Sequence, residues 1–212
     1  MSIKKLILEY KKLKPNIRSR LKEFDNFKEA NDDDIFSELA FCIFTPGSKA
    51  INGDKAVKEL RRANLLFNGT KDKISGKLRG VVRFHNNKAS YLVEARKAFK
   101  NGKGICIKKR LNSRNTLRTR DWLVENIKGL GYKEAGHFLR NIGLGQDIAI
   151  LDTHILKNLK RYRVISKTPE SISKKSYFDI EEKMRRFSKR VKIPLDELDL
   201  LFWSKQTGFI FK

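Results

Sequence analysis

The sequence predicts an all-α fold, and three observations support that class. Apolar residues recur at helical spacing along most of the 212 residues, whereas the alternation typical of strands is nearly absent. Proline, glycine and Asn-Gly pairs separate the helical stretches, as helix breakers and turn formers do. Hydrophobic residues make up 40% of the chain, which is enough for a core and argues against a disordered basic tail.

The first helical stretches lie near the amino terminus. An apolar stripe over residues 3–13 should end at Pro15, because proline breaks the helical hydrogen-bond ladder. A second stripe begins at Ile17. Asp32–Asp34 should open a third helix that stops before Pro46, since acidic side chains suit the positive end of the helix dipole.

The helical pattern continues through the rest of the chain. Beyond a turn at Asn68-Gly69, it predicts one helix over residues 86–99 and another over 116–127. Thr168-Pro169 is typical of an N-cap followed by proline at the first helical position. A last helix should run from about 195 to 205.

The charge is strongly unbalanced. Lys and Arg number 48 and Asp and Glu number 24, so the net charge is +24. Such a chain favours a polyanionic partner, and nucleic acid is the first candidate because neutralised phosphates release counterions. An anionic membrane surface is the alternative. Lys-rich surfaces also occur on heat-adapted proteins, but those usually balance Lys with Glu.

Several classes of protein are excluded by what the sequence lacks. No run of eighteen apolar residues is present, so no membrane span is expected, and the first residues lack the apolar core of a secretory signal. Cys42 and Cys106 are far apart, which excludes a disulfide framework and a CxxC-type zinc or iron–sulfur site. An intracellular location follows.

The most informative stretch is a helical hairpin over residues 122–142. Its turn is Gly129-Leu130-Gly131, in which both glycines can adopt positive φ and Leu130 can pin the turn into the core. The bare turn amides and the start of the second helix would face outward and bind phosphate without reading sequence. The alternative is a plain αα-hairpin with a glycine cap. The net charge favours phosphate binding.

Two residues after the turn, Lys133 falls in the first turn of the second helix. The helix dipole disfavours the charged form of a lysine at this position, so the neutral amine becomes available as a nucleophile. A solvated lysine near a turn is the commoner case. Further on, Asp152 is a good N-cap for an amphipathic helix. An ionised carboxylate of this kind can also stabilise a cationic sugar transition state. Each residue alone is weak support, and the pair with the hairpin is stronger.

The hairpin, the lysine and the aspartate together resemble the helix-hairpin-helix DNA glycosylases of the endonuclease III superfamily. The chain is most similar to the type 2 8-oxoguanine DNA glycosylase/AP lyases of archaea and some bacteria, and the terminal Lys212 belongs to that pattern. The matching stretches span most of the chain: Glu38–Pro46, Arg83–Ala89, Ile127–Ala135, His137–Gly143, Ile150–Asp152 and Leu198–Trp203.

The resemblance implies a two-lobed, all-α helix-hairpin-helix fold with DNA bound in the cleft between the lobes. Residues 33–147 would form a helical barrel that carries the hairpin, and residues 1–32 and 148–212 would form the second lobe. The implied activity is excision of 8-oxoguanine from duplex DNA. In it Lys133 forms a Schiff base with the sugar, the strand is nicked by β-elimination, and Asp152 supports the charge on the sugar.

The resemblance also implies residues that recognise the base. The family's final lysine helps to distinguish 8-oxoguanine from guanine, which corresponds to Lys212. Trp203 would stack on the flipped base, and a core position is equally compatible with a tryptophan in the last helix. His137 lies one helical turn after Lys133 and could face the pocket, or it could be structural.

Two positions depart from the family's pattern. Gly47 stands where relatives carry a polar wedge, so Ser48, Phe84 or another residue must fill the hole left by the flipped base. Thr153 stands where an arginine often follows the aspartate, so a phosphate or structural contact is missing.

No metal is expected, because His85, His137 and His154 show no ligand spacing. No other cofactor is expected, apart from a monovalent cation that the hairpin could hold. The expected partner is double-stranded DNA containing 8-oxoguanine, bound by a monomer in the cytoplasm, at the nucleoid. The alternatives are a non-catalytic helix-hairpin-helix module that grips duplex DNA, and a glycosylase for a different oxidised base.

Overall fold

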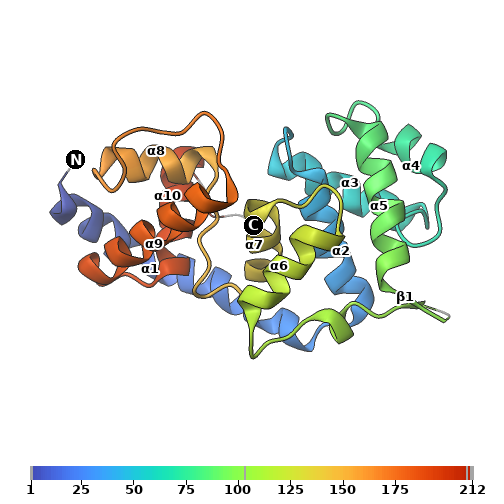
Figure 1. Cartoon of the computed structure of the whole chain (residues 1–212), viewed down its shortest axis with the longest axis horizontal. Helices are drawn as coiled ribbons and strands as arrows, with labels where there is room; N and C mark the ends of the chain where they lie inside the picture. Colours follow the sequence, from blue (N-terminus) through green and yellow to red (C-terminus); the bar gives the residue numbers. More distant parts are fainter. Residues whose placement is uncertain (1, 103, 209, 211–212) are drawn as a thin grey trace. The chain divides into compact units, whose positions relative to one another are not determined.

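The structure is a computed structural model, which describes residues 2–102, 104–208 and 210 (Figure 1). The described residues form ten α-helices, two short 3-10 helices and one ribbon of two-residue strands, β1 (Lys100–Asn101) and β2 (Gly104–Ile105). The prediction of an all-α protein is therefore confirmed. The helices are α1 (Ile3–Asn26), α2 (Asp32–Phe44), α3 (Ala50–Arg62), α4 (Lys71–Leu78), α5 (His85–Phe99), α6 (Thr116–Asn126), α7 (Tyr132–Asn141), α8 (Thr153–Arg161), α9 (Lys174–Val191) and α10 (Leu195–Thr207).

The chain divides into two compact units. One is continuous and comprises Glu29–Leu139, and the other combines Met1–Lys28 with Arg140–Lys212. We expected these boundaries later in the chain, at residues 33 and 147. Arg140 explains the earlier second boundary, because its guanidinium pairs with Asp199 and lies 5.4 Å from the centre of the Phe24 ring. Both of those partners belong to the discontinuous unit.

Helix α2 is the centre of the continuous unit and packs against α3 and α5. Every residue from Ile35 to Phe44 is buried, as expected for a helix surrounded by others. Its amino end begins as predicted, with three acids in the first turn. The Asn31 side chain caps it by accepting from the Asp34 N–H at 2.9 Å.

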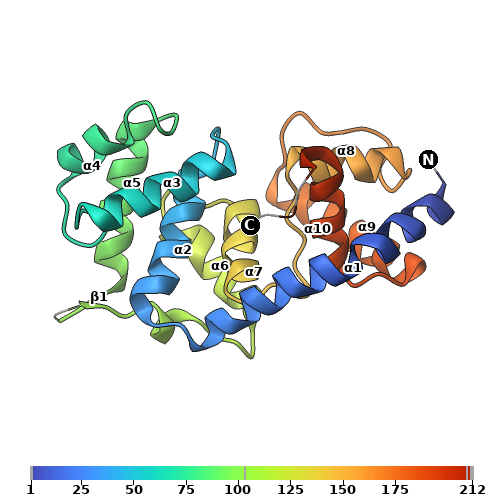
Figure 2. The same cartoon turned by 180° about the vertical axis from the view of Figure 1, so that it is seen from behind.

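Helix α10 is the centre of the discontinuous unit and contacts α1, α8 and α9 (Figures 1 and 2). The predicted break at Pro15 is wrong, because α1 continues through it to Asn26. Pro15 is exposed, and Glu197 of α10 holds the helix on both sides of it. That carboxylate accepts from the Tyr10 hydroxyl and, at 3.1 Å, from Arg18 Nε. Packing between the two ends of the chain thus outweighs the local cost of proline, about 3 kcal/mol.

The predicted helix start at Thr168-Pro169 is also wrong. Helix α9 begins at Lys174, and Ser173 caps it by accepting from the Ser176 N–H at 3.3 Å. A serine three residues before a free N–H satisfies the same need as the predicted threonine. In the part of the chain that the structure describes, no helix is long and apolar enough to cross a membrane.

Candidate active site

The hairpin turn joins α6 to α7 and is shaped by one glycine. Gly129 has φ +87°, and a Cβ atom there would lie 2.6 Å from Cδ2 of Tyr91. Both the backbone and the neighbouring ring therefore require glycine. Of the two turn glycines that can adopt positive φ, Gly129 does so and Gly131 does not. Leu130 is buried, as predicted for the residue that fixes the turn in the core.

The turn amides are less bare than expected. The N–H of Leu130 donates to the Ile127 carbonyl at 3.2 Å, and the N–H of Gly131 donates to Oε2 of Glu134 at 3.3 Å. Glu134 is the third residue of α7 and closes the helix start as the acid of a capping box does. Glu134 was not predicted from the sequence to have this role. An anion at this hairpin would meet the dipole of α7 and the first-turn N–H groups rather than these two amides.

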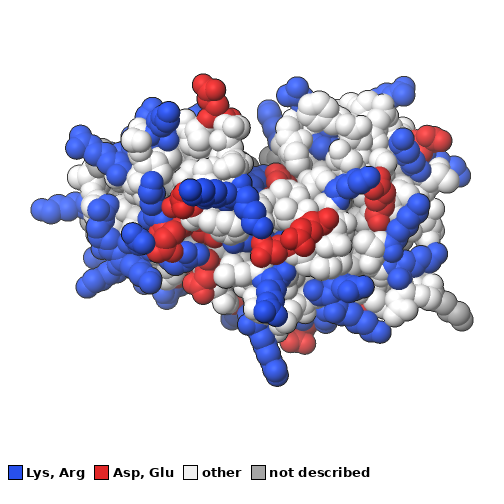
Figure 3. Space-filling view, in the orientation of Figure 1, with Lys and Arg blue, Asp and Glu red and all other residues white. Residues whose placement is uncertain are grey.

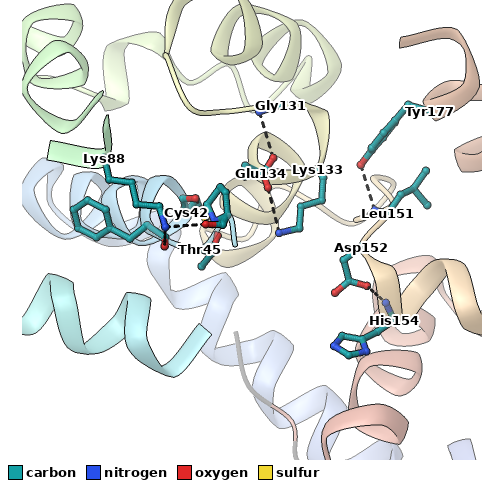
Figure 4. Close-up of polar contacts among 12 residues, drawn as sticks. Cys42, Thr45, Lys88, Gly131, Lys133, Glu134, Leu151, Asp152, His154 and Tyr177 are labelled. Carbon is teal, nitrogen blue, oxygen red and sulfur yellow. Dashed lines mark hydrogen bonds and ion pairs between the residues drawn. The ribbon is translucent and has the colours of Figure 1, made fainter. Parts of the chain in front are cut away.

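Lys133 is the second residue of α7, in the first turn as predicted. Its side chain is 26% exposed, and Nζ lies 3.3 Å from Oε1 of Glu134. Glu134 therefore contacts the turn with one oxygen and the lysine with the other (Figure 4). The amine is shielded from bulk solvent on most sides but remains reachable, which suits a nucleophile.

Asp152 caps α8, as the sequence predicted. Its Oδ1 accepts from the N–H groups of His154 and Ile155, each at 2.8 Å. No described residue bonds Oδ2, so that oxygen can still accept a hydrogen bond or face a positive charge. The two amide donors hold the carboxylate in a fixed position at the start of α8.

The segment before Asp152 is fixed by helix α9. The Tyr177 hydroxyl donates to the Ala149 carbonyl at 2.7 Å and receives the Leu151 N–H at 3.4 Å. Glu181 accepts from the Ala149 N–H at 2.9 Å. Sequence reasoning missed these two supporting side chains, because each lies on α9 among ordinary polar positions. Asp152 thus extends from a backbone that is tied to a neighbouring helix.

The residues expected to recognise the base lie in different settings. Trp203, on α10, is partly exposed, and its ring meets the His154 ring edge-on with centroids 6.5 Å apart. His137, on α7, is buried with its ring edge-on to Phe41 at 5.5 Å, which agrees with the structural alternative. Lys212 lies outside the described residues.

The two candidate wedge residues differ sharply in exposure. Phe84 is 57% exposed and has φ +58°, which is rare for an aromatic residue. Ser48 is partly exposed, and its hydroxyl already has two partners: Oγ accepts from the Arg83 N–H at 2.9 Å and from Lys88 Nζ at 3.0 Å. Phe84 is therefore the better candidate to enter a base stack.

The fold and the site define the class as a helix-hairpin-helix DNA glycosylase, with a lysine at the start of the second hairpin helix and a capping aspartate further on. A sequence model described as 8-oxoguanine DNA glycosylase matches residues 17–193. The chain therefore belongs to the 8-oxoguanine DNA glycosylase family.

Individual relatives and solved structures agree with that membership. A protein of Fusobacterium nucleatum named 8-oxoguanine DNA glycosylase/AP lyase is 47% identical over 205 residues, which cover 96% of this chain and 94% of that protein. The crystal structure of the Methanocaldococcus jannaschii 8-oxoguanine DNA glycosylase matches with a TM-score of 0.88 and 38% identity, over 99% of this chain and 95% of that one. The Thermotoga maritima enzyme matches with a TM-score of 0.86 and 33% identity, over the whole of both chains.

Proposed function

We propose that this protein is a bifunctional repair enzyme that excises 8-oxoguanine from duplex DNA and then nicks the strand. Its curated relatives carry the name 8-oxoguanine DNA glycosylase/AP lyase. The M. jannaschii enzyme has also been crystallised with a 15mer DNA containing 8-oxoguanine, and that structure has a TM-score of 0.87 with this chain. The observation that carries the lyase half of the proposal is Lys133, a reachable amine at the start of α7.

The reaction begins when the damaged nucleotide is flipped out of the duplex. The neutral amine of Lys133 attacks C1′ of the sugar, and the bond from C1′ to the base breaks with the electron pair leaving on the base. Opening of the sugar ring gives a Schiff base between Nζ and C1′. Loss of a proton from C2′ then expels the 3′ phosphate, which breaks the strand by β-elimination.

Asp152 would stabilise the positive charge that builds on the sugar. The geometry that supports this role is the fixed carboxylate, with Oδ1 bonded to two helix amides and Oδ2 left to face charge. A preorganised carboxylate needs no reorientation as charge develops, which is the main source of electrostatic catalysis.

Binding of the duplex rests on charge and on the hairpin. Lys and Arg side chains outnumber acidic ones on the face shown in Figure 3, in keeping with the net charge of +24. The positive end of α7 suits a phosphate group.

Trp203 would stack on the flipped base, Lys212 would help to identify it, and Phe84 would fill the hole it leaves. The protein would act as a monomer in the cytoplasm, at the nucleoid.

Borohydride trapping on duplexes with different lesions tests the proposal. The reductant fixes the Schiff base, so we expect a covalent adduct on a duplex with 8-oxoguanine and on one with an abasic site. A passive DNA-binding module would form no adduct on any duplex. Preferential trapping on an oxidised pyrimidine would contradict the assigned base.

A further inference from the structure

A second lysine of the continuous unit, Lys88, is almost fully buried. It lies on α5 with 3% of its surface exposed, and its Nζ donates to the Phe44 carbonyl at 2.7 Å and the Pro46 carbonyl at 2.8 Å. The third contact is Oγ of Ser48 at 3.0 Å. An ammonium group has three donors, so all three are used. Burial, with the charge of Arg83 nearby, lowers the pKa of Lys88 to about 8, which leaves it mostly protonated at neutral pH.

The first two contacts close the end of helix α2. Phe44 is its last residue, and the final carbonyls of a helix have no partner within the helix. A cation at this end also complements the negative end of the dipole. The Thr45 hydroxyl adds a further closure by donating to the Cys42 carbonyl at 3.0 Å (Figure 4). The chain therefore leaves α2 along a fixed path.

The third contact connects this turn to Phe84. Ser48 accepts from Lys88 and also from the N–H of Arg83, the residue before Phe84. Gly47 has φ +66°, and a Cβ atom there would lie 3.1 Å from Cε2 of Phe84. Glycine at this position therefore leaves room for the phenylalanine ring. Residues 45–48 and 83–84 are thus joined by hydrogen bonds and by the contact between Gly47 and Phe84, and together they are here called the wedge loop.

We propose that Lys88 is a positioning residue that fixes the wedge loop, so that the exposed ring of Phe84 is held ready to replace the flipped base in the stack. The inference rests on the proposed function. Flipping a paired base costs a few kcal/mol of unpairing and unstacking, and a prearranged wedge recovers part of that cost only if it needs no ordering of its own. Lys88 acts through Phe84 and does not touch the reacting atoms.

The experiment compares two substrates under single-turnover conditions. Excision of 8-oxoguanine paired with cytosine requires flipping of a stacked base, whereas cleavage at a preformed abasic site requires little. Lys88→Met keeps the length of the side chain and removes its donors. We expect it to slow excision by about tenfold or more and to slow abasic-site cleavage by less than about twofold, since small misplacements cost this much. Ser48→Ala is a milder change. It should also lower the ratio of the excision rate to the rate of abasic-site cleavage, by a smaller factor.

Two further measurements complete the test. Amide hydrogen exchange in the free protein should quicken in peptides covering the wedge loop of Lys88→Met, and not in those covering the hairpin. Lys97→Met, an exposed change on the same helix, should alter neither the exchange nor the substrate ratio. Equal losses on the two substrates, or unchanged exchange in the wedge loop, would overturn the positioning role. A wild-type protein that excises no 8-oxoguanine would refute the proposed function instead, and the exchange data would still decide whether Lys88 holds the loop.

Discussion

Two lysines of the continuous unit, Lys88 and Lys133, have opposite surroundings. Lys88 is buried and donates to three oxygens, two of them backbone carbonyls. The side chain of Lys133 is 26% exposed and has an ion pair with the adjacent Glu134. Both residues carry the same functional group, so their surroundings decide what each can do.

The difference shows what a lysine needs for each task. A positioning lysine must stay protonated, because each of its three N–H groups donates a hydrogen bond. The groups that accept these bonds must also stay in place. A nucleophile must lose its proton and bring its nitrogen to carbon, which requires few and replaceable contacts. The contrast agrees with the proposed roles, in which Lys133 is the nucleophile and Lys88 a positioning residue. Four substitutions test this comparison.

The largest effect should come from Lys133→Gln. Loss of the only proposed nucleophile should lower excision and borohydride trapping by about a thousandfold or more. Duplex binding should persist, because the hairpin is unchanged. Gel-based trapping with a binding assay measures both, and Lys97→Gln serves as a control for the loss of one charge. A Lys133→Gln protein that still forms the trapped adduct would remove this residue from the role.

Asp152→Asn should have the next largest effect. Asparagine is as good an N-cap as aspartate, so the melting temperature should change little. The substitution removes the charge that is proposed to stabilise the sugar. Excision should therefore slow by about a hundredfold, while the dissociation constant for DNA changes far less. Single-turnover kinetics and thermal unfolding separate these quantities. If stability alone fell, Asp152 would be a cap and nothing more.

Gly129→Ala tests the turn that precedes Lys133. The new methyl group meets Tyr91 in addition to an unfavourable φ, so the free energy of unfolding should fall by about 2–3 kcal/mol. Gly80→Ala is the matched control. Gly80 has φ +75° with no described atom within 4 Å of the new group, so it should show only the backbone cost of about 1 kcal/mol. If urea denaturation gave the same loss of unfolding free energy for both variants, the Tyr91 ring would have moved aside without an energetic cost.

The smallest effect should come from Lys128→Gln, beside the same turn. Lys128 is exposed and its Nζ lies 2.9 Å from Glu94. We propose that Lys128, exposed beside the hairpin, contacts one phosphate of the bound duplex. Its loss should then reduce the slope of log affinity against log salt by about 0.9, with little change in trapping. A salt titration of duplex binding measures this slope. An unchanged slope would mean that Lys128 stays paired with Glu94 when DNA is bound.

Local signals predicted the fold where packing agreed with them. Helices α2, α5, α6 and α10 begin within about a residue of their predicted starts, because caps, acids and apolar spacing all indicate the same ends. Pro15 failed as a stop, because contacts with the far end of the chain hold α1 together across it. No pattern near Pro15 contains that information.

At the candidate site, too, local features could be predicted from the sequence and contacts between distant residues could not. The Gly129 turn, Lys133 in a first turn and Asp152 as a cap are all local features, and the structure has each of them. Lys88 was missed because a lysine in a polar stretch is ordinarily exposed. One signal was present: Lys88 falls in helical register with Leu92, on the apolar face of α5. Its three oxygen partners come from a distant turn, which only the folded chain brings together.

The central place of α10 has a consequence for the order in which the protein is made. The unit that carries Lys133 is one uninterrupted segment, so it can fold as it leaves the ribosome. The unit that carries Asp152 must wait for Leu195–Thr207, around which α1, α8 and α9 pack. Helix α1 is made before α8, α9 and α10, and it remains without its partner α10 until that helix follows. The unit that carries the hairpin can thus be complete before α10 has been made and before the capping aspartate is held in place.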